Sequence, residues 1–164
     1  MRWYRFAVLV LLATVLQAGF LSNFTIKPDL LLILLVFFAV YSNTSEAIIS
    51  SFTIGFAADL IGPAMGPQTI SFGLFGTALA YLHRVIAIRK MPYQALAIFA
   101  IGILAGTMVH LLNLLKSEPG PAVTYNDIFK MALYSGIAGP FLFLPLAWWM
   151  RIKTNRFRRN RIMR

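Results

Sequence analysis

Residues Tyr93–Leu115 read YQALAIFAIGILAGTMVHLLNLL, a run of 23 positions without Asp, Glu, Lys or Arg. A helix rises about 1.5 Å per residue, so a run of this length can cross the roughly 30 Å hydrocarbon core of a bilayer. The whole chain has 164 residues, of which 59% are hydrophobic and 12% are charged. Soluble domains carry about 25% charged residues. The run and the composition together predict an all-α integral membrane protein.

Five further apolar runs flank this one. Two of the six runs are long enough to cross a membrane unaided, whereas the first three need polar flanks such as Ser42–Asn43 and Ser45–Glu46 to complete a span. Arg2 and Arg5 before the first run imitate a secretory signal, but no convincing cleavage site follows, so we expect this run to stay as a span. Residues 1–150 are therefore predicted to form a six-helix transmembrane bundle with spans at about 6–22, 29–43, 46–61, 69–88, 93–115 and 128–150.

Two five-span arrangements stay open at this point: residues 30–61 as one long tilted helix, or a re-entrant segment around Tyr41. The distribution of basic residues favours six spans, because Lys and Arg accumulate in cytoplasmic loops. With the N-terminus inside, twelve of the 15 basic residues lie on the cytoplasmic side, and only Lys27, Lys116 and Lys130 lie outside. We therefore predict that both termini are cytoplasmic.

Residues 151–164 are predicted to form a basic cytoplasmic tail directly after Trp148–Trp149. Aromatic rings at headgroup level followed by cations favour a surface of anionic lipid. An acidic cytoplasmic protein is the alternative partner, and nucleic acid is not expected because base-stacking aromatic residues are scarce in the tail. The basic residues are Arg151, Lys153, Arg156, Arg158, Arg159, Arg161 and Arg164.

Asp59 lies at the C-terminal end of the third run, where the helix dipole disfavours a carboxylate. A cation such as Lys27, Lys116 or Lys130, or several loop N–H groups, should therefore compensate its charge. A partner contact and proton or ion handling are the other interpretations.

His110 and Asn113 share one face of the fifth run, where we expect a hydrogen-bonded interhelical histidine. A single histidine without a second ligand is a poor metal site, and the lack of cysteine excludes disulfides and thiolate zinc sites. No catalytic constellation, metal or cofactor is predicted.

Prolines and glycines indicate how the helices begin, bend and pack. Pro28 and Pro92 mark helix beginnings, and Pro140 and Pro145 should kink the sixth helix. Two stripes of small residues are predicted to bring helices together within one chain, with a homodimer as the alternative. These stripes are Gly102 with Gly106, and Thr69 with Gly73 and Thr77.

Three stretches of the sequence carry a family resemblance. They are Leu16–Gln17, then Lys27-Pro28-Asp29-Leu30-Leu31-Leu32, and then Gly55-Phe56-Ala57-Ala58-Asp59-Leu60 leading into Gly62 and Gly66. With these stretches the chain resembles the MreD family of bacterial rod shape-determining proteins. Gly62 and Gly66 each precede a proline and predict a compact turn.

The resemblance implies a non-enzymatic scaffold subunit of the cell-elongation complex in the bacterial cytoplasmic membrane. Its principal partner would be MreC, with MreB and the synthase pair of RodA and a penicillin-binding transpeptidase in the same assembly. The family fold is similar to that of the S components of energy-coupling-factor transporters, so a vitamin-binding S component is the alternative function. Thr14 and Ala18 only approximate the Ala-x-x-x-Ala contact motif of those proteins.

Overall fold

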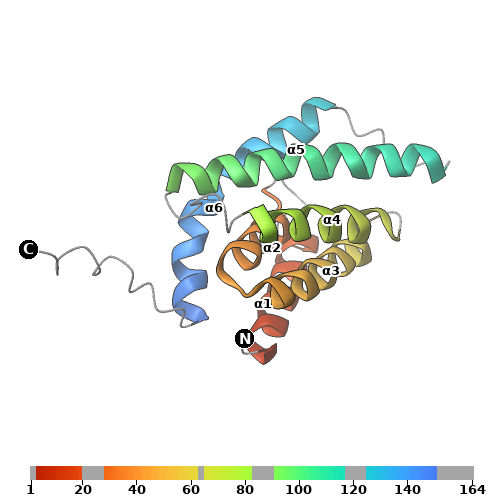
Figure 1. Cartoon of the computed structure of the whole chain (residues 1–164). Helices are drawn as coiled ribbons and strands as arrows, with labels where there is room; N and C mark the ends of the chain where they lie inside the picture. Colours follow the sequence, from red (N-terminus) through yellow and green to blue (C-terminus); the bar gives the residue numbers. More distant parts are fainter. Residues whose placement is uncertain (1–2, 20–27, 63–64, 83–90, 117–124, 151–164) are drawn as a thin grey trace, which may run out of the picture.

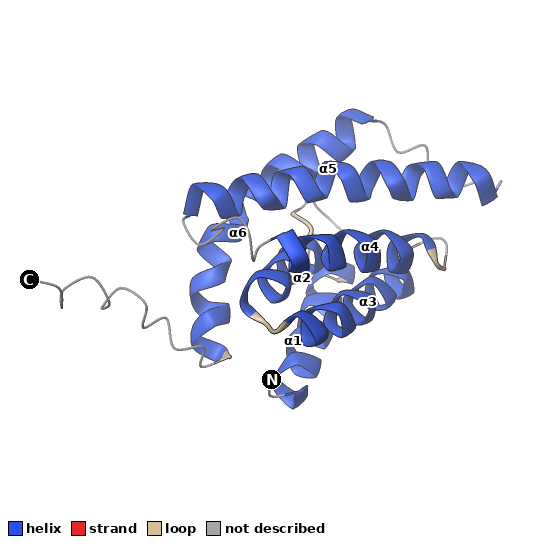
Figure 2. Cartoon of the chain, viewed as in Figure 1, coloured by secondary structure: helices blue, strands red, loops and turns tan. Residues whose placement is uncertain are grey.

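The computed structural model describes residues 3–19, 28–62, 65–82, 91–116 and 125–150. Every regular element in these ranges is a helix (Figure 2), which confirms the predicted all-α class. The helices are α1 (Trp3–Ala18), α2 (Leu30–Tyr41), α3 (Thr44–Ile61), α4 (Pro67–Leu82), α5 (Met91–Lys116) and α6 (Tyr125–Trp149).

Three helices are long and apolar enough to cross a membrane, namely Thr44–Ile61, Pro92–Leu115 and Tyr125–Trp149. The third run was expected to be short, but α3 qualifies because its helix includes Ser45 and Glu46. The predicted fourth span at 69–88 begins earlier, at Pro67, and its described helix ends at Leu82. Residues 83–88 lie outside the described part of the chain.

Helix α2 differs most from its predicted span at 29–43. It has 12 residues, which corresponds to about 18 Å, and the chain leaves the helix at Ser42 in extended conformation. Residues 31–40 are all buried, and α2 contacts each of the other five helices. A helix that is apolar on every side lies in a protein core or in contact with lipid, and these contacts place α2 in the core. The run LLLILLVFFAVY therefore forms the centre of the bundle rather than a helix of full membrane length (Figure 1).

A break between α2 and α3 excludes the single long helix over residues 30–61. Ser42 ends α2 and Asn43 precedes α3, and both have extended backbone angles. Two antiparallel pairs, α3 with α4 and α5 with α6, pack around α2. The alternative of one tilted helix is thus excluded, because capping residues divide the run.

The small-residue stripes pack within the chain. A methyl group added to Gly106 of α5 would lie 2.6 Å from Cγ2 of Ile128 on α6, and one added to Gly102 would lie 3.0 Å from Cβ of Ala132. On α4, a methyl group at Gly73 would overlap the ring of Phe52 on α3. These glycines allow close helix contacts where apolar burial gives little net drive.

Helix α6 changes direction along the stretch that contains Pro140 and Pro145 (Figure 1), as the sequence predicts. Before the prolines it packs closely against α5, where a methyl group on Gly136 would lie 3.2 Å from the carbonyl oxygen of Ala95. Beyond Pro140 it packs against α2, and the rings of Phe143 and Phe37 lie 5.3 Å apart. The bend lets one helix cover two different neighbours.

Candidate functional site

Asp59 joins the end of α3 to the beginning of α4. Its Oδ1 accepts the N–H of Gln68 at 2.9 Å, and its Oδ2 accepts the N–H of Thr69 at 2.8 Å and the Thr69 hydroxyl proton. These N–H groups belong to the first turn of α4, which has no intrahelical acceptors for them. The carboxylate thus compensates the positive end of α4. The donors that Asp59 was expected to need come from backbone and hydroxyl groups in the described residues.

Gly55 lies one helical turn before Asp59, on the same face of α3. A methyl group at this position would lie 2.7 Å from Cα of Thr69 and 2.9 Å from the carbonyl oxygen of Gln68. Both neighbours are backbone atoms, so they cannot rotate away. The Gly-x-x-x-Asp spacing therefore combines a close approach of two helices with a carboxylate that caps the second one. We call Gly55, Asp59, Gln68 and Thr69 the α3–α4 joint.

Asp29 is the N-cap of α2, and it is only 7% exposed. Its Oδ1 accepts the N–H groups of Leu31 at 3.0 Å and Leu32 at 3.1 Å, as a capping carboxylate does. The side chain of Gln17 on α1 donates to the same oxygen at 3.1 Å and accepts the Leu31 N–H at 3.2 Å. The backbone N–H of Asp29 donates to Oγ of Ser135 on α6 at 2.8 Å.

Three of these five hydrogen bonds, two with Gln17 and one with Ser135, tie the beginning of the central helix to α1 and α6. We call Gln17, Asp29 and Ser135 the α2 joint. Pro28 lies immediately before the cap, so it precedes the first helical turn instead of occupying it. Pro92, in contrast, is the second residue of α5.

Gly62 and Gly66 border the turn between α3 and α4. Gly62 caps α3, and its N–H donates to the carbonyl oxygens of Ala58 and Asp59. Gly66 has a φ of 112°, a value that disfavours residues with a Cβ atom. Its carbonyl oxygen accepts the N–H of Ile70 at 3.0 Å, so the turn leads directly into α4.

His110 and Asn113 do not form a common polar centre. The His110 ring meets the ring of Tyr125 on α6 edge-to-face, with centroids 5.3 Å apart. The contact is interhelical as expected, but it is aromatic. Oδ1 of Asn113 is buried without a hydrogen-bond partner. Among the described residues, no group of three or more His, Cys, Asp or Glu side chains could hold a metal ion.

Two hydrogen bonds show which helix ends lie together. Arg5 near the start of α1 donates to the carbonyl oxygen of Trp149 at the end of α6 at 2.8 Å. Gln94 near the start of α5 donates to the Tyr41 hydroxyl at the end of α2 at 2.9 Å. An up-and-down bundle with an even number of helices brings these ends together. The basic tail at 151–164 and Lys27 lie outside the described residues.

The comparisons with known proteins identify one family. No curated protein and no solved structure matches this chain. The family model described as rod shape-determining protein MreD matches residues 1–153, which include both joints and all six helices. Its members are membrane proteins, in agreement with the three helices that can cross a bilayer. The match confirms the resemblance found in the sequence, and the chain belongs to the MreD family of rod shape-determining proteins.

Proposed function

We propose that this chain is a non-enzymatic scaffold subunit of the cell-elongation complex, which organises peptidoglycan synthesis along the lateral wall. The family match over residues 1–153 carries this proposal. The principal partner is MreC, and MreB and the synthase formed by RodA and a penicillin-binding transpeptidase belong to the same assembly.

The exposed helix faces support a role in binding other membrane helices. Phe141 and Trp148 on α6 are 71% and 82% exposed, and Leu11 on α1 is 63% exposed. Exposed apolar side chains of this size contact lipid or partner helices in a membrane protein. We propose that the partner subunits use these faces, while the two joints hold the helices that present them.

We also propose a six-span arrangement in the bacterial inner membrane, with both termini in the cytoplasm and the basic tail on anionic lipid. The twelve-to-three distribution of basic residues supports this orientation. The joining of the start of α1 to the end of α6 by Arg5 and Trp149 agrees with an even number of spans.

The function predicts a defect in cell shape. Removal of this protein from its rod-shaped host should produce round cells, and a tagged full-length chain should copurify with MreC from solubilised membranes. Re-expression of the wild-type chain should restore rods. Normal rods after removal, together with copurification of a vitamin, would instead support an S component.

The orientation predicts a pattern of labelling in intact cells. The chain contains no cysteine, so each introduced thiol reports one position. Cysteines at Arg2 and Arg158 should be protected from a membrane-impermeant maleimide, and a cysteine at Glu118 should be labelled. Labelling of Arg2→Cys but not of Arg158→Cys would place the ends on opposite sides and exclude six spans.

A further inference from the structure

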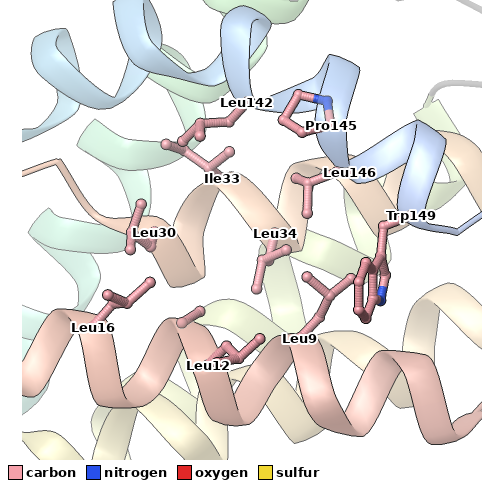
Figure 3. Close-up of a pocket in the computed structure, with 11 residues that line it drawn as sticks. Leu9, Leu12, Leu16, Leu30, Ile33, Leu34, Leu142, Pro145, Leu146 and Trp149 are labelled. Atoms are coloured by element: carbon pink, nitrogen blue, oxygen red, sulfur yellow. The ribbon is translucent and has the colours of Figure 1, made fainter.

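An apolar groove of about 270 Å³ lies between α1 and α6, with α2 as its floor (Figure 3). Three leucines from successive turns of α1 form one wall. Leu146 and Trp149 of α6 form the opposite wall, and Leu34 of α2 lies between the two walls. The α1 wall consists of Leu9, Leu12 and Leu16.

Arg5 lies next to the end of the groove that Trp149 lines. Its guanidinium donates to the carbonyl oxygen of Trp149, whose ring lines the groove, and its Nε donates to the Tyr4 hydroxyl at 3.0 Å. A guanidinium has five N–H donors, and the bonds to described residues use two of them, so Arg5 can also donate to an anionic headgroup.

The apolar walls of the groove restrict its occupant. Apolar sites do not retain water, and an empty groove forfeits dispersion contacts along its walls. A hydrocarbon chain matches these aliphatic and aromatic walls and needs no polar partner inside the groove. In a membrane protein, the molecule that supplies such a chain beside the groove is a phospholipid.

We propose that the groove binds one anionic phospholipid, with an acyl chain between α1 and α6 and the phosphate on Arg5. The acyl chain gains little by leaving the bilayer, because lipid tails are as apolar as the leucines that line the groove. Selectivity therefore comes from the headgroup charge. The inference rests on the membrane location of the family, and the proposed orientation places the lipid in the cytoplasmic leaflet.

The acyl-chain part is tested with the purified full-length chain in nanodiscs of phosphatidylcholine and phosphatidylglycerol with matched acyl chains. A photoactivatable group on the phosphatidylglycerol acyl chain should label the leucines of the groove. Leu12→Trp fills the groove and should lower this labelling at least fivefold. Leu11→Trp is the matched control, because Leu11 is a neighbouring exposed residue that does not line the groove, and it should leave the labelling unchanged.

The headgroup part is tested by native mass spectrometry of the lipids that the chain retains. Wild-type protein should prefer phosphatidylglycerol over phosphatidylcholine about fivefold, which corresponds to about 1 kcal/mol for one surface charge. Arg5→Gln should abolish the preference, whereas Arg5→Lys should keep it. Lys130→Gln removes a charge near the other end of α6 and should also keep it. Thermal unfolding of each variant checks that it folds.

Three results would overturn the proposal: equal retention of the two lipids by wild-type protein, labelling of Leu12→Trp at the wild-type level, or crosslinking of a cysteine at Leu12 to a second copy of the chain instead of lipid. The lipid assays contain neither MreC nor cells. A negative result in the shape assay therefore leaves the lipid result standing, and the reverse also holds.

Discussion

Asp59→Ala is expected to lower the free energy of unfolding by about 3 kcal/mol, because it removes three charge-assisted hydrogen bonds at once. Asp59 is 2% exposed, so water does not readily replace the lost acceptor for the N–H groups of Gln68 and Thr69. Loss of an N-cap alone costs about 1 kcal/mol, and this carboxylate also joins two helices.

Thermal unfolding in detergent micelles measures this effect. At this chain length, about 3 kcal/mol corresponds to a fall of about 6–12 °C in the unfolding midpoint. Asp59→Asn keeps one acceptor oxygen and should lose less. Asp127→Ala removes an exposed carboxylate from the first turn of α6 and should change the midpoint little. An Asp59→Ala variant with a wild-type midpoint and lost MreC binding would instead identify Asp59 as a partner contact.

The long apolar runs of the sequence predict the helices because they leave few alternatives. A continuous run such as Tyr93–Leu115 cannot alternate between two faces as a half-buried strand does, and α5 forms over it. Asp59 was singled out because an ionisable group beside apolar helices needs partners, whereas Asp29 was named only as part of the stretch that carries the family resemblance. Both of them cap helices in the structure.

The burial of α2 was not predictable from its residues. A run of twelve apolar residues has the same composition in the centre of a bundle as in contact with lipid, so hydropathy cannot distinguish the two. Only the contacts of α2 with all five other helices distinguish them. The polar pair Ser42–Asn43 did indicate a helix end, because polar residues of this kind favour helix caps. The same pair also fits the end of a membrane span at headgroup level, so the sequence could not decide between the two.

The partners of the two carboxylates were missed as well. Gln68, Thr69 and Ser135 are neutral polar residues, and such residues are common in helices of membrane bundles. A weak signal existed at α4, where Pro67 marks the first turn and thereby makes the next N–H groups candidates for capping. The sequence predicted loop N–H groups as one possible set of donors to Asp59, but nothing in it indicated that the first turn of α4 would supply them.

The two joints suggest why the motif residues lie where they do. Each joint fixes a helix beginning through a carboxylate and connects it to another helix, at α2 through Gln17 and at α4 through Gly55. The bilayer gives helices little apolar drive to associate, so specific contacts must set their positions. A scaffold needs fixed helix faces, and the joints provide them.

Gly55→Ala is the sharpest test of whether the α3–α4 joint sets the position of α4, because this substitution adds one methyl group and removes no hydrogen bond. The methyl group would lie 2.7 Å from Cα of Thr69 and 3.1 Å from Cβ of Phe72, so α4 must move away from α3. Overpacking of this kind costs about 1–3 kcal/mol. The movement also lengthens the hydrogen bonds from Thr69 to Asp59. We therefore expect a fall in the unfolding midpoint comparable to that of Asp59→Ala, and Gly55→Leu should prevent folding.

Gly102→Ala is the matched control, since its methyl group would meet the Cβ of Ala132 and the flexible tip of Leu32, each at 3.0 Å. These distances are longer than the 2.7 Å backbone contact at Gly55, so α6 needs to move less and the loss should be smaller. The double variant Gly55→Ala with Asp59→Ala then tests the coupling. If the glycine acts by placing α4 against the carboxylate, the two losses overlap and the double variant is more stable than their sum predicts. Additive losses would show instead that packing and capping at this joint are independent.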